Sequence, residues 1–314
     1  MEHIIDTFSN GLKNLFKNPV IFLPFLIFFA LTIVLSIIWV ALVIVSTVDV
    51  IAIEDINWVF LGATTFIYLA LIFVLSSYVS AGTIGMSKEV ISTGKTKLSD
   101  MFTYGNKYTI RFIFANIILA ILQLVAVIFW LPLIYVCMNS GYTLESFFEI
   151  LFSNPDALVP FFISLILPIL LGSLLTFIYL IILYFLFYFA FYAIIVDNMS
   201  VIASFKKSYA MLRQSFWKVI AFILAVYFIT AGITSIFYTI YYIFAYSMLP
   251  IILLDPTLLI VFTVVNYILE IILAVLLLIL SIIVTVWTTR FYMSFNDHEL
   301  YVEEAKENLL ETDF

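Results

Sequence analysis

The sequence predicts an all-α integral membrane protein with six transmembrane helices. Of its 314 residues, 65% are hydrophobic and 11% are charged, and the mean hydropathy is +1.23. A soluble domain carries roughly 25% charged residues, so lipid must be the solvent for most of this chain. Six apolar stretches each exceed the ~20 residues that a helix needs to cross a hydrocarbon core. Their apolarity is continuous rather than alternating, which favours helices over strands.

We predict a six-span membrane domain over residues 1–296 and an acidic cytoplasmic tail over residues 297–314. Pro24, Pro132 and Pro168 are expected to kink the first, third and fourth spans, because proline removes a backbone donor and crowds the preceding turn. The first apolar run is far longer than a signal-peptide core and is expected to be a permanent span. The predicted spans are 20–47, 58–82, 110–136, 159–193, 217–247 and 257–289.

The basic residues predict the orientation. All 13 Lys and Arg residues fall in four short stretches beside the spans, whereas the predicted outer loops contain acids and no basic residue. Basic residues in short loops stay on the cytoplasmic face, so both termini are expected in the cytoplasm of a cell-membrane protein. The net charge of −7 argues against nucleic acid as a partner.

Three cytoplasmic segments are predicted to be amphipathic helices on the inner leaflet, because their apolar residues recur at helical spacing. The clearest covers 201–216, a second runs from Ile4 to Phe16, and a fainter third covers 98–108, where Gly105 interrupts it. Basic faces of this kind suit anionic lipid head groups. The candidate lipid contacts are Lys206, Lys207, Arg213, Lys13 and Lys17.

The starts of these three segments, near residues 4, 98 and 201, lie 94 and 103 residues apart. One interpretation is a helix-hairpin unit used three times, as in many membrane carriers. The other is that any bundle with basic inner loops shows this spacing. The small residues between Ser76 and Gly85 predict a close-packing surface, within one bundle or between two copies.

The remaining polar segments allow alternatives. Residues 143–152 are predicted to form a short outer helix, which is either a lid over a cavity or a surface-bound connector. Residues 297–313 carry seven acids against Lys306 and form either a solvated tail or a docking helix. Cys137 is the single cysteine, which excludes an intramolecular disulfide and a thiolate metal site.

Glu270 is the one charged residue well inside a predicted span, some 13 residues and so about 20 Å into the sixth. A carboxylate there costs several kcal/mol unless it is protonated, paired or hydrated. Asn266 lies one turn earlier on the same face, and Asn116 and Gln123 on the third span are candidate partners. The group is either a site for a proton, a cation or a polar head group, or a neutral hydrogen-bonded contact between helices.

Enzymatic signatures are absent from the sequence. His3 and His298 are the two histidines and stand near the chain ends, so no metal triad or His-based nucleophile system can form within the membrane. The stretch Gly82-Thr83-Ile84-Gly85 lacks the third glycine and the strand context of a dinucleotide site. We therefore predict no catalytic activity, no cofactor and no metal.

Four stretches of the sequence resemble those of a known group of proteins. They are Ala81-Gly82-Thr83-Ile84-Gly85, Leu98-Ser99-Asp100-Met101-Phe102, Ile195-Val196-Asp197-Asn198 and Ser204-Phe205-Lys206-Lys207-Ser208-Tyr209. The chain resembles a group of uncharacterised prokaryotic, mainly archaeal, six-span membrane proteins. Its layout is similar to the membrane domain of some bacterial glycerophosphodiester phosphodiesterases. The resemblance implies an all-helical membrane domain and an archaeal source, and it transfers no activity.

Two functional hypotheses follow. The leading one is a non-enzymatic membrane protein that organises lipid or a partner protein, through the basic helices or the acidic tail. The alternative is a small transporter or permease component that uses Glu270 and Asn266 near mid-membrane. A lipid-modifying enzyme would need a catalytic cluster that the sequence does not contain.

Overall fold

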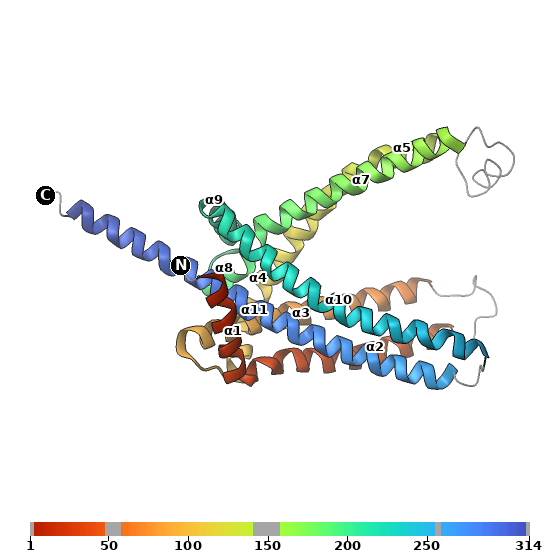
Figure 1. The fold of residues 1–314 in the computed structure, drawn as a ribbon, viewed down its shortest axis with the longest axis horizontal. Helices are drawn as coiled ribbons and strands as arrows, with labels where there is room; N and C mark the ends of the chain where they lie inside the picture. The colour runs from red at the N-terminus through yellow and green to blue at the C-terminus, as the bar shows by residue number, and fades with distance from the viewer. Residues whose placement is uncertain (1–2, 48–57, 141–157, 255–258, 312–314) are drawn as a thin grey trace. The chain divides into compact units, whose positions relative to one another are not determined.

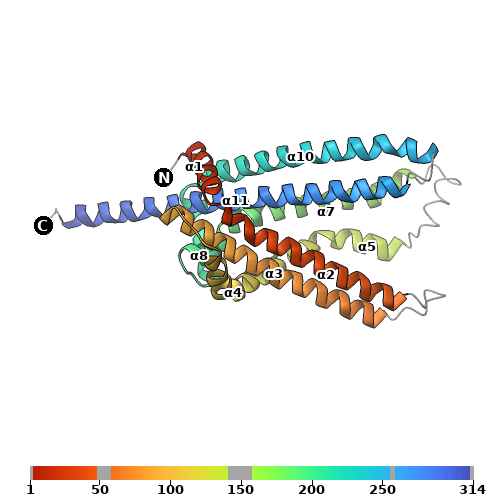
Figure 2. The ribbon, with the colours of Figure 1, turned by 90° about the horizontal axis from the view of Figure 1, so that it is seen from below.

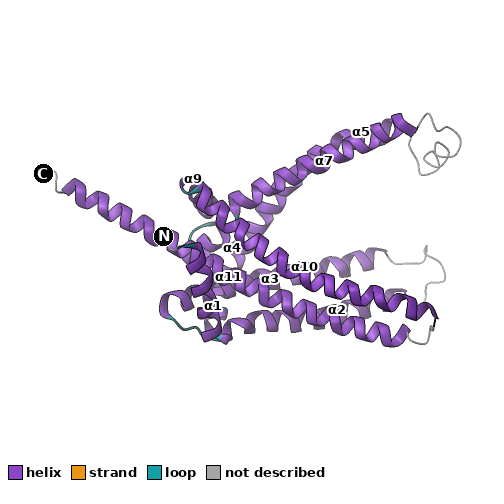
Figure 3. Ribbon diagram, in the orientation of Figure 1, coloured by secondary structure: helices purple, strands orange, loops and turns teal. Residues whose placement is uncertain are grey.

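A computed structural model describes residues 3–47, 58–140, 158–254 and 259–311 (Figure 1). Within these ranges the secondary structure is helical and contains no strand (Figure 3). Six stretches are long and apolar enough to cross a membrane, which confirms the predicted fold class. They are Pro19–Ile44, Trp58–Thr93, Leu98–Tyr135, Ile166–Val196, Phe216–Phe244 and Val261–Phe295. The predicted outer helix at 143–152 lies outside the described residues.

The chain divides into two compact units. Unit 1 combines Met1–Ile113 with Phe189–Phe314, and unit 2 is Phe114–Tyr188. In unit 1, two pairs of long helices lie side by side (Figures 1 and 2). One pair is α2 (Leu23–Thr47) with α3 (Trp58–Thr93), and the other is α10 (Phe216–Leu254) with α11 (Leu259–Glu311). Helix α4 (Leu98–Leu124) begins in unit 1 and ends in unit 2.

Three short helices complete unit 1: α1 (Ile4–Lys17), α8 (Ala190–Val196) and α9 (Val201–Gln214). A 3-10 turn, η1 (Pro19–Phe22), joins α1 to α2. Helices α1 and α9 coincide with two of the three segments that were predicted to be short helices. Unit 2 continues from α4 through a 3-10 segment, η3 (Val125–Trp130), into α5 (Leu131–Ser140) and contains α7 (Leu158–Phe187).

The buried core of unit 1 lies at one end of its long helices, which we call the basic end because the described Lys and Arg residues of the unit gather there. Helix α3 has 36 residues and is about 54 Å long, well beyond the ~30 Å hydrocarbon core. Its buried residues fall between Ser77 and Val90, whereas its first half exposes apolar side chains. The second span is therefore longer than predicted, and the added turns are packed in protein.

Helix α1 packs on α11 within this core. Its buried residues are Thr7, Gly11 and Leu15, one per helical turn. The Trp287 indole N–H donates to the Phe8 carbonyl at 3.0 Å, and the rings of Phe8 and Trp287 lie 4.6 Å apart. A Cβ on Gly11 would lie 2.6 Å from Trp287 Cδ1, so only glycine allows this approach.

The third predicted amphipathic helix, 98–108, is not a separate element, and that prediction was wrong. These residues are the first turns of α4, which continues without a break to Leu124. Asp100 caps its start, because its Oδ2 accepts from the Lys97 N–H at 2.8 Å and from the Thr96 hydroxyl at 2.9 Å. Gly105 does not interrupt this helix. The Tyr78 ring fills the space where a Cβ of residue 105 would lie.

The three prolines have different outcomes. Pro24 is the second residue of α2, where a missing N–H costs little, and a 3-10 turn precedes it. Pro132 is the second residue of α5, and the preceding 3-10 segment η3 divides the third span. Pro168 lies inside α7. The predicted continuous fourth span, 159–193, is interrupted at 188–189, where the Phe189 N–H donates to the Ser208 hydroxyl at 3.2 Å.

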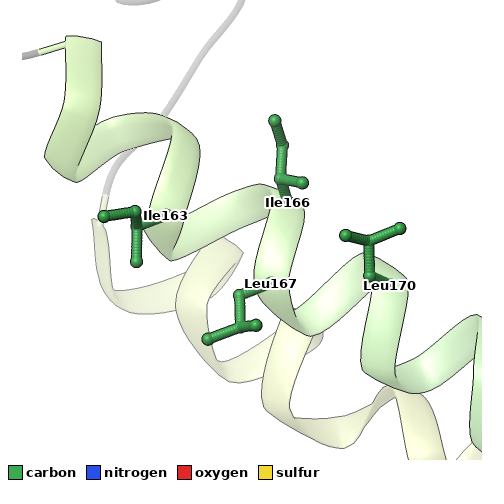
Figure 4. Close-up of a pocket in the computed structure, with 4 residues that line it drawn as sticks. All are labelled: Ile163, Ile166, Leu167 and Leu170. Carbon is green, nitrogen blue, oxygen red and sulfur yellow. The ribbon is translucent and has the colours of Figure 1, made fainter.

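Unit 2 is held together by polar contacts inside an apolar surface. The Trp130 indole N–H donates to Thr176 Oγ1 at 3.0 Å, and the Tyr179 hydroxyl donates to the Leu122 carbonyl at 2.7 Å. A shallow surface hollow of about 310 Å³ is lined by Ile163, Ile166, Leu167 and Leu170, all from α7 (Figure 4). Its lining among the described residues is entirely apolar.

Candidate functional site

Polar groups of unit 1 gather around the turn that joins α8 to α9, residues 197–200. Asn198 has φ 53°, in the left-handed region that asparagine tolerates better than most residues. The Met199 N–H donates to the Ala193 carbonyl at 3.4 Å around this residue, a common way to end a helix. The turn reverses the chain so that α9 packs against α8.

Two cations bind the backbone of this turn. Lys88, on α3, donates from Nζ to the Val196 carbonyl at 2.9 Å. Arg111, on α4, donates from Nη1 to Asn198 O at 3.3 Å, Asn198 Oδ1 at 3.1 Å and Met199 O at 3.1 Å. Cations satisfy the carbonyls at the C-terminus of a helix, where no intrahelical donor exists.

Two tyrosines complete the group, which we call the turn clamp (Lys88, Tyr108, Arg111, Asp197, Asn198 and Tyr292). The Tyr108 hydroxyl donates to Asn198 Oδ1 at 3.0 Å, and the Tyr292 hydroxyl donates to Asp197 Oδ2. Both tyrosines are buried. The clamp therefore joins α3, α4 and α11 to one turn and fixes where α9 begins. Its side chains donate to backbone carbonyls and to one another, an arrangement that positions the turn.

The candidate lipid contacts lie on the short helices at the basic end. Lys13 and Lys17 on α1, and Lys206 and Arg213 on α9, are exposed, whereas Lys207 is half-buried. The buried face of α9 is made by Ser204, Phe205, Ser208, Met211 and Leu212. Phe205 and Leu212 belong to the apolar face of 201–216, which was predicted to lie on the inner leaflet. They are packed in protein instead, because α9 needs that face for its contact with the core. Ile202 and Tyr209, which belong to the same apolar face of 201–216, are exposed.

Glu270 and Asn266 do lie together on α11, as predicted. Asn266 Nδ2 donates to Glu270 Oε1 at 3.1 Å. The Tyr241 hydroxyl, from α10, donates to the same oxygen at 3.1 Å. Glu270 is exposed on the surface of unit 1, and Asn266 Oδ1 is buried without a hydrogen-bond partner among the described residues. Asn116 and Gln123 are residues of unit 2, and their partnership with Glu270 stays a prediction.

Sequence reasoning missed the turn clamp and the Tyr241 contact. Arg111 stood at the inner end of a predicted span, where an arginine is expected to anchor the helix at the interface. Tyr241 belongs to a cluster, Tyr238 to Tyr246, that is typical of interfacial anchors. Neither position carries a signal for its partner, because the contacts of Arg111 and Tyr241 span 87 and 29 residues of sequence.

The described residues contain no group of three or more His, Cys, Asp and Glu side chains that could hold a metal ion. A family model described as a domain of unknown function, DUF7847, matches residues 3–295. Neither the curated proteins nor the solved structures include one that matches this chain.

Proposed function

The chain belongs to the DUF7847 family, and we propose that it is a non-enzymatic, multi-pass cell-membrane protein that organises anionic lipid at its basic end. We place this end and both termini in the cytoplasm, because the positive-inside rule keeps basic residues of short loops on that side. In a second version of the proposal, the ligand is a partner protein. It binds either the same surface or the helical segment 297–311 at the end of α11.

One observation carries the proposal: exposed apolar side chains alternate with exposed cations on the short helices. On α1, Ile5 is 69% and Phe16 is 73% exposed, beside Lys13 and Lys17. Across α9 and the start of α10, Ile202, Tyr209 and Trp217 are exposed beside Lys206 and Arg213. Such a surface matches a lipid interface, where apolar groups enter the acyl region and cations meet phosphates.

The turn clamp supports the same role. A lipid-binding helix loses less conformational entropy on binding when its position is already fixed. Here α9 starts at a turn held by cations from α3 and α4. The basic helix α9 is therefore already positioned for lipid binding at the end of the bundle.

Changing Lys206, Lys207 and Arg213 together to Gln is expected to weaken retention of anionic lipid about tenfold or more, because each cation near a charged leaflet adds to binding. The measurement is native mass spectrometry of the full chain from nanodiscs that contain phosphatidylglycerol and phosphatidylcholine. A matched control changes Lys95, Lys97 and Lys107 to Gln, which removes the same charge from the part of the basic end outside the short helices α1 and α9. Equal lipid retention by the two triple variants would contradict the proposal.

The orientation is testable separately. In a Cys137→Ala background, a cysteine introduced by Lys95→Cys is expected to react with a membrane-impermeant maleimide only after cells are permeabilised. A cysteine introduced by Asp49→Cys, in a predicted outer loop, is expected to react in intact cells. Labelling of Lys95→Cys in intact cells would reverse the proposed orientation.

A further inference from the structure

The polar group on the α10–α11 pair lies deep within the apolar spans. Glu270 is nine residues, about 14 Å, from the start of the Val261–Phe295 span. Tyr241, on α10, lies three residues, about 4.5 Å, before the Phe216–Phe244 span ends, and α10 itself continues to Leu254. The depth of Glu270 on α11 is about half of a ~30 Å hydrocarbon core, which places its carboxyl group near the middle.

Unit 1 leaves one side of this group uncovered. Tyr267, Ile268 and Ile271, the neighbours of Glu270 on α11, are all exposed. No Lys or Arg occurs between Lys218 and Arg290 in the sequence, so α10 and α11 supply no cation at this depth. A carboxyl group at such a position must be neutralised by a ligand or a proton.

Tyr241, which donates to the carboxyl group, belongs to a row of aromatic rings on α10. Tyr241 contacts Tyr242 edge to face at 5.5 Å, and Tyr242 stacks with Tyr238 at 6.2 Å and with Tyr246 at 6.1 Å. Tyr238, Tyr242 and Tyr246 are exposed, as is Tyr267 on α11. The faces of tyrosine rings attract cations, and an apolar setting strengthens that attraction.

We propose that Glu270, Asn266 and Tyr241, with the tyrosines beside them, form a membrane-embedded site for a lipophilic ammonium ion. The Glu270 carboxylate accepts from the ammonium N–H groups, and its Oε2 takes part in none of the hydrogen bonds to Asn266 and Tyr241. The neighbouring rings cover the rest of the charge. Strongly hydrated metal ions fit less well, because they require several oxygen ligands and this group offers few.

The test uses the full chain in phosphatidylcholine nanodiscs and a decylammonium probe that carries a dansyl fluorophore. We expect saturable binding by the native chain, about tenfold weaker binding by Glu270→Gln, and about threefold weaker binding by Tyr241→Phe, from the usual size of charged and neutral hydrogen bonds. Tyr227→Phe is the matched control. This exposed tyrosine lies 14 residues from Tyr241 on the same helix, about 21 Å away, and its loss is expected to leave binding unchanged.

A decanol probe with the same fluorophore separates charge from hydrophobicity. We expect it to show no saturable binding and no competition with the ammonium probe. If the alcohol competes equally, or if Glu270→Gln binds the ammonium probe as tightly as the native chain, the group is a structural contact and the proposal fails. Glu270→Asp keeps the charge and is expected to retain part of the binding, which keeps the test decisive if Glu270→Gln unfolds. The basic end is unchanged in these variants, so the result is independent of the lipid proposal.

Discussion

Replacing Gly85 with Ala is expected to lower the stability of the chain by about 3 kcal/mol and its Tm by roughly 5 °C. A Cβ at this position would lie 2.1 Å from Tyr104 Cγ and 2.4 Å from Tyr104 Cβ. These atoms are close to the α4 backbone, so they cannot move without a shift of the helix. The Tyr104 hydroxyl also donates to Glu89, a contact that any displacement of the ring would break.

The measurement is thermal unfolding of the detergent-solubilised chain, followed by intrinsic fluorescence. Gly62→Ala is the matched control, because it lies on the same helix and a Cβ there meets nothing within 4 Å. Since alanine has the higher helix propensity, this control is expected to be neutral or stabilising by up to about 1 kcal/mol. Equal unfolding temperatures for the two variants would mean that α3 and α4 do not pack through Gly85.

The sequence was sufficient for the elements whose physics is local. Length and continuous apolarity decide whether a helix can cross the bilayer, and all six predicted spans are present. The small residues Gly82 and Gly85 were expected to mark close packing, and they meet Met101 and Tyr104 of α4. The amide of Asn266 was expected beside Glu270, because residues four apart share a helical face.

The contacts that cross the chain could not be predicted in the same way. Arg111 reaches a turn 87 residues away, and Tyr292 reaches Asp197 across 95 residues. An arginine or tyrosine near a span end is sufficiently explained by anchoring at the interface, so the pattern does not select a specific partner. The sequence likewise does not show whether the apolar face of 201–216 contacts lipid or protein, since both accept apolar side chains.

Changing Arg111 to Met is expected to destabilise the chain by about 2 kcal/mol and to loosen the turn that positions α9. The side chain keeps its apolar volume, but Asn198 O, Asn198 Oδ1 and Met199 O each lose a donor. The contact with Met199 O is part-buried, and a buried polar group that loses its partner costs about 1–3 kcal/mol. Thermal unfolding reports the loss of stability. Trypsin reports the loosening, because it cleaves after Lys206, Lys207 and Arg213 of α9.

Lys107→Met separates a specific role of Arg111 from the loss of one positive charge. Lys107 is exposed on the same helix, and its described contact is with the Tyr108 ring, 4.9 Å from Nζ. An exposed cation–π contact contributes about 0.5–1 kcal/mol, so we expect a smaller effect and no faster cleavage of α9.

A second pair of variants tests the turn itself. Asn198→Ala is expected to be less stable than Asn198→Gly by about 1–2 kcal/mol, because both lose the side-chain acceptor but only alanine is strained at φ 53°. If Arg111→Met and Lys107→Met behave alike and the two Asn198 variants are equally stable, the clamp does not hold this turn, and α9 is positioned by its apolar contacts alone.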